Sequence, residues 1–215
     1  MEPYLLKGAK YNLINLLREK GITDERILKA FDQVERHLFI TETFFWDKAY
    51  QDIAIPIGCN QTISAPSTVA FQTQLLNIAP RERVLEIGTG SGFQAAILCV
   101  LGAIVFTIER QVELHRHARA LFKQLHLEIP SLFGDGFKGS PEYAPFDKIL
   151  VTCGAPNVPE QLLKQLKVNG VMVIPVGDTQ QTMKRITKIG EDQYEEAEFV
   201  NFTFVPMLSK IEFGK

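Results

Sequence analysis

The sequence predicts an α/β fold in which a doubly wound, mostly parallel sheet carries a C-terminal antiparallel hairpin and an N-terminal helical flank. Short apolar runs alternate with helical patterns between residues 83 and 176, and a glycine-rich turn follows the first of these runs. Two longer strand-like runs come after them. Alternation of this kind is typical of a parallel sheet that helices cover on both faces.

The first 80 residues are expected to form the helical flank. Thr23 is the predicted N-cap of a helix, because Asp24 and Glu25 behind it would interact favourably with the helix dipole. Apolar residues then recur at helical spacing, at Ile27, Phe31, Val34 and Leu38. We expect this stripe to pack against the sheet as a lid or flank.

From residue 83 onward the pattern is regular. Strands are expected at residues 83–88, 103–109, 130–133, 146–152 and 170–176, and helices at about 91–101, 111–126 and 159–166. This succession predicts five parallel strands joined by helices.

After Gly177 the rhythm changes to two longer runs, residues 183–189 and 198–205, which we expect to form an antiparallel hairpin at the sheet edge. The length suits one domain. The expected domain covers residues 1–215, with the flank and a substrate and cofactor loop at 1–80, a cofactor-binding core at 81–178, and the hairpin and tail at 179–215.

Composition and charge restrict the partners of the chain. A net charge of -2, from 23 basic and 25 acidic residues without a basic stripe, argues against nucleic acid. The chain lacks a signal-peptide pattern and any apolar stretch long enough to span a bilayer. Cys59, Cys99 and Cys153 follow no disulfide or metal-ligand spacing. We expect a cytoplasmic monomer with reduced thiols, no metal and no membrane contact.

The turn after the first strand indicates a nucleotide-type cofactor. Glu86 stands two residues ahead of three glycines that alternate with other residues. A dinucleotide fingerprint has Gly or Ala where this chain has Phe93, and it binds a pyrophosphate that Glu86 would repel. S-adenosylmethionine carries cations and no phosphate, so the acid favours this methyl donor. The residues of the turn expected to bind it are Glu86, Gly88, Thr89, Gly90, Ser91 and Gly92.

A second acid, Glu109, ends the next apolar strand. In nucleotide-binding βαβ units an acid roughly 20 residues after the first glycine accepts hydrogen bonds from the ribose hydroxyls. Glu109 stands at this offset from Gly88 and is expected to bind the ribose. If the three glycines are considered without the two acids, an ordinary strand-to-helix turn is the alternative to a cofactor-binding turn.

Three segments resemble those of one known family. The first reads Pro-Ile-Gly-Cys-Asn-Gln-Thr-Ile-Ser-Ala-Pro over residues 56–66, the second is the glycine-rich turn, and the third reads Gly-Asp-Gly-Phe-Lys-Gly over residues 134–139. With Ala-Pro-Phe-Asp at 144–147 and Val-Pro-Met at 205–207, they resemble the protein-L-isoaspartate O-methyltransferase family. The Gln-Thr-Ile-Ser part is the most specific. The resemblance covers nearly the whole chain and implies a Rossmann-like class I methyltransferase fold.

The resemblance also implies an activity and a set of site residues. The chain is expected to transfer methyl from S-adenosylmethionine to the free carboxylate of isoaspartyl residues in damaged proteins, which initiates their repair. Ser64 would be the catalytic serine, and Asp135 and Gly136 would contact the adenine. Further cofactor contacts are expected from Thr62, Ile63 and Ser64, and substrate contacts from Ser64, Ala65, Val205 and Pro206.

The expected acceptor needs no general base. An α-carboxyl group with a pKa of about 3.3 to 3.7 is ionised at neutral pH. Ser64 is therefore expected to orient the carboxylate or to hold the cofactor beside it, and its alternative role is to cap the helix that begins at Pro66. The four histidines lie outside all of these motifs and are expected to have surface or packing roles: His37, His115, His117 and His126.

Two positions depart from the family pattern, and two other functions remain open. Ser67 stands where many relatives have histidine, and Cys153, where alanine is frequent, is expected to be a tolerated small residue. An adenine or amide methyltransferase would need an Asn/Asp-Pro-Pro-Tyr motif where residues 152–156 read Thr-Cys-Gly-Ala-Pro. A module that binds the cofactor without turnover is the second alternative.

Overall fold

Apolar strands near the middle of the chain build the central sheet. The computed structural model describes residues 3–213, with side chains described for residues 7–199 and 202–213. Within this range, seven strands form one sheet in the order β5-β4-β3-β6-β7-β8-β9. They are β3 (Arg83–Ile87), β4 (Ile104–Glu109), β5 (Ser131–Phe133), β6 (Phe146–Val151), β7 (Leu166–Gly177), β8 (Gln181–Lys188) and β9 (Tyr194–Phe202).

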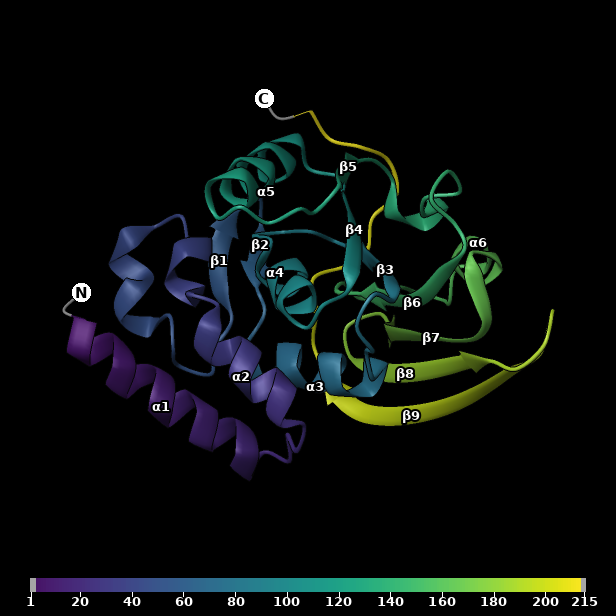
Figure 1. Ribbon diagram of the computed structural model, residues 1–215. Coiled ribbons are helices and arrows are strands. Elements are labelled where there is room, and N and C mark those ends of the chain that lie inside the picture. Colours follow the sequence, from purple (N-terminus) through teal and green to yellow (C-terminus); the bar gives the residue numbers. More distant parts are fainter. Residues whose placement is uncertain (1–2, 214–215) are drawn as a thin grey trace.

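The strand directions confirm the predicted class. The first five strands of the sheet pair in parallel, and β8 and β9 add an antiparallel hairpin at one edge (Figure 1). The helices are α1 (Pro3–Glu19), α2 (Glu25–Gln33), α3 (Pro66–Leu76), α4 (Phe93–Val100), α5 (Val112–Gln124) and α6 (Glu160–Lys164). Short 3-10 turns lie at η1 (Arg36–Phe39), η2 (Thr43–Lys48) and η3 (Gly136–Lys138).

Alternation along the strands places side chains on both faces of the sheet. In β3, Val84 joins the core that contains side chains of α3, α4 and α5, whereas Leu85 and Ile87 join the core that contains Leu162 of α6. Glu86 is two residues from Val84 and therefore points to the same face of the sheet, the one that α4 covers. Thr107 of β4 is its partner in the strand register.

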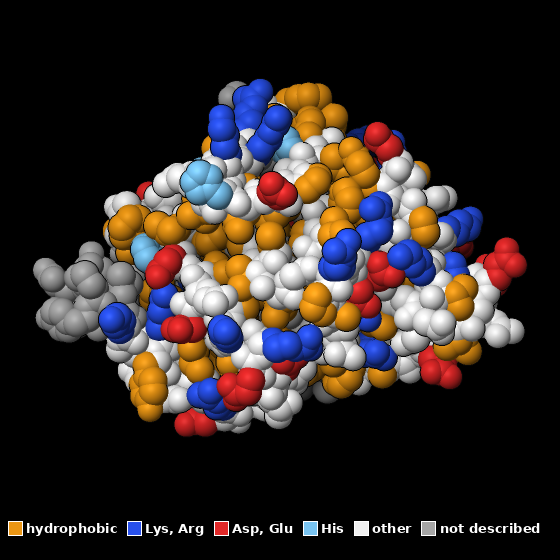
Figure 2. Space-filling view, in the orientation of Figure 1, with side chains coloured by type: hydrophobic (Ala, Val, Ile, Leu, Met, Phe, Trp, Pro, Cys, Tyr) orange, Lys and Arg blue, Asp and Glu red, His pale blue; other side chains and the backbone are white. Residues whose placement is uncertain are grey.

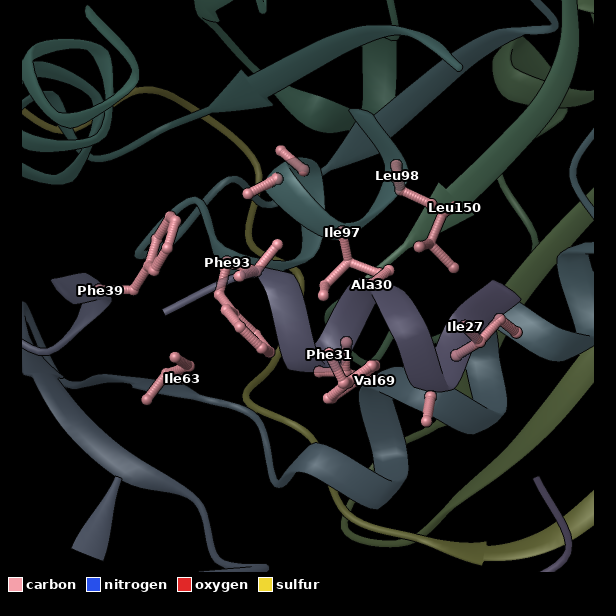
Figure 3. Close-up of a cluster of buried hydrophobic side chains, with 14 of the residues drawn as sticks. Ile27, Ala30, Phe31, Phe39, Ile63, Val69, Phe93, Ile97, Leu98 and Leu150 are labelled. Atoms are coloured by element: carbon pink, nitrogen blue, oxygen red, sulfur yellow. The ribbon is translucent and has the colours of Figure 1, made fainter. Parts of the chain in front are cut away.

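The N-terminal flank packs on other helices as well as on the sheet. Phe31 of α2 contacts Phe93 of α4 edge to face, with ring centroids 5.6 Å apart, inside the cluster in Figure 3. Full burial of one such side chain is worth about 1.5 to 3 kcal/mol. The predicted N-cap is wrong by one residue, because the side chain of Asp24 accepts from the N–H of Arg26, whereas the N–H of Thr23 donates to Gln74.

The expected flank and loop at residues 1–80 also contain two short strands that the sequence did not predict. Residues 55–63 form a small hairpin of β1 (Ile55–Gly58) and β2 (Gln61–Ile63), which pair antiparallel. Cys59 and Asn60 connect the strands with φ of 50° and 53°, which is the conformation that two-residue hairpin turns require. The hairpin carries the Gln-Thr-Ile-Ser segment to the start of α3.

After β9 the chain returns across the ends of the parallel strands. Val205 accepts a hydrogen bond from the Gly154 N–H at 2.8 Å, and Met207 donates to the Gly154 carbonyl at 2.7 Å. Further on, the Glu212 N–H donates to the Arg110 carbonyl at 2.8 Å. Figure 1 shows this yellow segment passing behind the sheet and rising beside β5. Among the described helices, none has both the length and the apolar character needed to cross a membrane.

Candidate active site

The glycine-rich turn joins β3 to α4 at the carboxyl edge of the sheet. Gly88 has φ of +94°, and a Cβ there would lie 2.6 Å from Thr152 Oγ1. Gly92 has φ of +89°, and its Cβ would lie 2.6 Å from the Phe122 ring of α5. Both positions therefore require glycine, for conformation and for space. The turn packs tightly against β6 and α5, so its backbone has a fixed place beside the strand ends.

Glu109 stands at the end of β4, facing the same turn. Its Oε2 accepts the Gly90 N–H at 2.9 Å and its Oε1 accepts the Gln111 N–H at 2.9 Å. Burial raises the pKa of Glu109, and these backbone donors oppose the rise. Each carboxylate oxygen has a second acceptor site, so Glu109 can still bind hydroxyl groups of a ligand.

One cavity opens beside this carboxylate, and we call it the Glu109 cavity. Ile87, Ile108 and Met207 give it apolar walls that suit a flat heterocycle. At Gly136 a Cβ would run into the side chain of Ile87, so only glycine leaves this wall open. The lining residues are Gln61, Ile87, Gly88, Ile108, Glu109, Arg110, Gln111, Gly136, Cys153, Pro206, Met207 and Leu208.

Two further cavities continue from it. The central cavity is lined by Thr62, Ile63, Ser64, Val69, Gln72, Gly88, Thr89, Gly90, Ser91, Phe93, Gln94 and Thr152. The outer cavity is lined by Ala54, Thr62, Ser64, Ala65, Thr68, Thr152, Thr203, Phe204 and Val205. Gly88 belongs to both the Glu109 and the central cavities, and Ser64 belongs to both the central and the outer cavities. The three cavities thus form a row with Ser64 between the second and the third.

Ser64 is not the cap of α3. Ala65 occupies the N-cap position without a side-chain hydrogen bond, and Asp52 Oδ1 accepts the Ser67 N–H at 2.8 Å instead. The capping alternative for Ser64 is therefore wrong, and Ser64 lines both the central and the outer cavities. Thr152 lines the same two cavities, and its hydroxyl donates to the Gly88 carbonyl at 2.7 Å.

Glu86 lies beneath the turn and lines none of the three cavities. Thr107 Oγ1 donates to its Oε2 and lies 2.6 Å from Thr89 Oγ1, while Oε1 has no hydrogen-bond partner among the described residues. Burial raises the pKa of Glu86 to about 8. The structure links this carboxyl group to the turn through two threonines, and direct contact with a cofactor stays a prediction.

The other expected site residues divide in a similar way. Gly136 and Pro206 line the Glu109 cavity, whereas Ala65 and Val205 line the outer one. Asp135 lines none of the three, since its Oδ1 accepts the Phe137 N–H at 3.0 Å and its Oδ2 accepts the Lys210 N–H at 3.2 Å. Gly92 also lies outside their lining.

Several lining residues were not among the expected ones. Thr68, Thr203 and Phe204 line the outer cavity, and Gln61, Met207 and Thr152 line the others. Gln61 and Met207 belong to the Gln-Thr-Ile-Ser and Val-Pro-Met segments, Thr68, Thr203 and Phe204 stand close to them, and Thr152 follows the apolar run that ends at the edge of the sheet. Cys153 lines the Glu109 cavity, where burial raises the pKa of its thiol to about 12 and keeps it protonated.

Two further observations concern what the site can hold. Among the described residues, Arg110 is the one basic residue in the lining of the three cavities, and its Nη2 lies 3.0 Å from Glu212 Oε2. A pyrophosphate would therefore find little positive charge, whereas a cationic cofactor with hydroxyl groups fits Glu109. A groove of about 940 Å³ lies between α1 and α2, but it contains none of the residues at the strand ends.

The likeness to known proteins is strong over nearly the whole chain. The family model described as protein-L-isoaspartate(D-aspartate) O-methyltransferase matches residues 8–212. The chain belongs to this family. A protein-L-isoaspartate O-methyltransferase of Flavobacterium psychrophilum is 51% identical over 203 residues, covering 94% of this chain and 95% of that protein. That of Christiangramia forsetii is 50% identical over 208 residues, covering 96% and 97%.

Solved structures of the family have the same fold. One protein-L-isoaspartate O-methyltransferase superposes with a TM-score of 0.86 at 28% identity, covering 94% of this chain and 67% of the other. A Plasmodium falciparum protein described as a putative member, in complex with S-adenosyl-L-homocysteine, gives 0.79 at 25% identity, covering 92% and 97%. The predicted family, fold, methyl-transfer activity and cofactor are thereby confirmed.

Proposed function

We propose that the row of three cavities is the path along which this isoaspartyl methyltransferase brings its two substrates together. The observation that carries the proposal is the shared lining: Gly88 joins the Glu109 and central cavities, and Ser64 joins the central and outer cavities. The methyl donor would extend from Glu109 to the central cavity. The isoaspartyl carboxylate would enter from the outer cavity and meet it at Ser64.

The residues around the donor have separable roles in this proposal. Glu109 accepts hydrogen bonds from the ribose hydroxyls, and Gly136 gives the adenine access to the apolar wall of Ile87. The turn from Gly88 to Ser91 holds the methionine portion, together with Thr62 and Ile63. Glu86 acts beneath this turn through Thr107 and Thr89. Asp135 orders the η3 turn, which places Gly136.

The chemistry asks for orientation more than for proton transfer. When bound, S-adenosylmethionine supplies an electrophilic methyl group on a sulfonium centre. The acceptor carboxylate is already ionised at neutral pH. Ser64 donates a hydrogen bond to one carboxylate oxygen and leaves the other aligned for attack, and such alignment contributes on the order of 7 to 11 kcal/mol. No histidine lines the three cavities, in keeping with a reaction that needs no base.

The peptide side of the site would be formed by Ala65, Val205 and Pro206. We further propose one domain over residues 1–215 and a monomer in the cytoplasm that contacts neither nucleic acid nor membrane. The even balance of charges supports the absence of a nucleic-acid partner, because acidic and basic side chains are mixed over most of the face in Figure 2. An adenine or amide methyltransferase is disfavoured, since residues 152–156 lack the paired acceptors of those enzymes.

The test uses two synthetic peptides that differ only in an isoaspartyl or a normal aspartyl linkage. We expect base-labile label from methyl-labelled S-adenosylmethionine on the isoaspartyl peptide alone. Label on neither peptide, with cofactor binding intact by calorimetry, would leave a cofactor-binding module without turnover. Equal label on both would contradict the specificity.

A further inference from the structure

An apolar hollow of about 330 Å³ lies beside α3, next to the outer cavity. It is lined by Lys20, Ile22, Ser67, Thr68, Phe71 and Phe202, and we call it the Phe71 hollow. We infer that this hollow is a subsite for a large apolar side chain of the peptide substrate, two or three residues from the isoaspartyl residue. The inference rests on the proposed function of the outer cavity.

The hollow adjoins the outer cavity, because Thr68 lines both. A row of aromatic rings joins them as well: the centroids of Phe204 and Phe202 are 6.3 Å apart, and Phe202 stacks on Phe71 at 5.5 Å with an interplanar angle of 20°. Phe204 is a wall of the outer cavity, while the other two rings belong to the hollow. A peptide that leaves the outer cavity along this side therefore has three aromatic rings beside it, those of Phe204, Phe202 and Phe71.

The geometry of α3 sets the distance along the peptide. Phe71 follows Thr68 by three residues and Ser67 by four, so each of the two lies beside Phe71 on the helix surface. Phe71 stands five positions after Pro66, which corresponds to about 8 Å along the helix axis at a rise of 1.5 Å per residue. An extended peptide advances about 3.3 Å per residue. The side chain that reaches Phe71 therefore belongs to the second or third residue from the one at Ser64.

The charges around the hollow favour an uncharged occupant. Lys20 Nζ lies 2.6 Å from Asp52 Oδ2, and the other oxygen of Asp52 accepts the Ser67 N–H. Burial acts to raise the pKa of Asp52, but the bonds from Lys20 and Ser67 outweigh it and lower the pKa, so the pair is ionised. The cation is therefore compensated within the protein. What remains for a ligand is the aromatic and aliphatic wall, with Ser67 as a small side chain that leaves the space open.

The experiment scans isoaspartyl peptides that carry either phenylalanine or serine at each of the three positions on both sides of the isoaspartyl residue. The full-length enzyme is assayed by methyl transfer with paired peptides in competition. We expect kcat/KM to favour phenylalanine about five- to tenfold at one position, two or three residues away, because a half-buried aromatic ring contributes that much to binding.

Two variants test the location of the subsite. Phe71→Ala removes a wall of the hollow, and Ser67→Phe fills the hollow. For both variants, the ratio of kcat/KM for the phenylalanine peptide to that for the serine peptide is expected to fall to within about twofold of one. The matched control is Phe44→Ala, a phenylalanine that is 68% exposed and lines none of these cavities, and it should keep the wild-type ratio. Binding of S-adenosyl-L-homocysteine by calorimetry shows that each variant is folded.

The outcomes separate the two proposals. No methyl transfer to any isoaspartyl peptide would overturn the proposed function itself. Transfer with a ratio near one at all six positions would overturn only the subsite. A preference that survives both Phe71→Ala and Ser67→Phe would place the aromatic side chain elsewhere, and a preference for serine over phenylalanine two or three residues away would contradict the apolar assignment.

Discussion

Glu86 and Glu109 are two buried acids on the same face of the sheet with different surroundings. Both oxygens of Glu109 accept backbone N–H groups and the side chain lines a cavity, whereas only one oxygen of Glu86 has a partner and the side chain lines none of the three. At neutral pH a buried acid without compensating donors keeps its proton. The two acids of the motif are therefore suited to different tasks, ligand binding for Glu109 and support of the turn for Glu86.

Glu109→Ala is expected to weaken binding of S-adenosyl-L-homocysteine by about tenfold or more, since the two ribose hydroxyls lose their acceptor, at roughly 0.5 to 1.5 kcal/mol for each hydrogen bond. Turnover at saturating cofactor should change less. Calorimetry measures the first effect and methyl-transfer kinetics the second. Glu128→Ala, at an exposed position, is the matched control and should bind normally.

Ser64→Ala is expected to lower turnover and to leave cofactor affinity nearly unchanged, which is the reverse of the effect of Glu109→Ala. Losing the donor that orients the carboxylate should lower kcat by about tenfold or more, with only a modest change in cofactor affinity. The exposed Ser209→Ala serves as control. Full activity of Ser64→Ala in the peptide assay would show that the role assigned to this serine is wrong.

At the scale of elements, the start of α3 depends on a residue outside the helix. Asp52→Ala removes the acceptor of the Ser67 N–H and should lower the free energy of unfolding by about 1 to 2 kcal/mol. Because the pKa of Asp52 is lowered in the folded protein, its contribution is present above the pKa of the unfolded chain and is lost as the pH falls through the folded pKa. Urea denaturation at pH 7 and pH 3 should therefore show that the free energies of unfolding of the wild type and Asp52→Ala differ less at the lower pH.

The sequence predicts elements well where periodicity is strong. The five parallel strands and the C-terminal hairpin lie close to their expected ranges, because buried strands are nearly continuous apolar runs. The hairpin of β1 and β2 was missed since strands of four and three residues are too short to show a period. Thr23 and Asp24 both suit an N-cap, and the tertiary contact of Thr23 with Gln74 decides between them.

For the whole molecule, the titration of Glu86 gives stability a pH dependence. Burial raises its pKa to about 8, against about 4.3 in an unfolded chain. The folded state thus holds the proton more tightly, so the contribution of Glu86 to stability is full below about pH 4.3 and is lost as the pH rises through about 8. Glu86→Gln keeps the shape without the charge. Urea denaturation should show that the free energy of unfolding of Glu86→Gln rises relative to that of the wild type between pH 5 and pH 8. A difference that stays constant over this range would contradict the raised pKa of Glu86.

The row of cavities could not be predicted from the sequence. Motifs indicated residues of the strand ends and of the segment before α3, but the walls made by Thr68, Phe204 and Met207 depend on contacts between distant parts of the chain. Asp135 shows the same limit, because nothing local reveals that the backbone of Lys210 binds its carboxylate. Long-range packing decides which residues of a motif face the ligand.

The returning segment at residues 205–212 also bears on how the protein is made. Lys210 lies 100 residues beyond Arg110, whose side chain it binds. At a synthesis rate of roughly 5 to 20 residues per second, the ribosome releases this wall of the Glu109 cavity about 5 to 20 seconds after the strand that carries Glu109. A nascent chain can assemble its parallel strands during that interval, but the pocket for the methyl donor is still open on one side. The parallel strands can therefore assemble before the cofactor has a complete pocket, and the wall of that pocket closes only after residues 205–212 have been made.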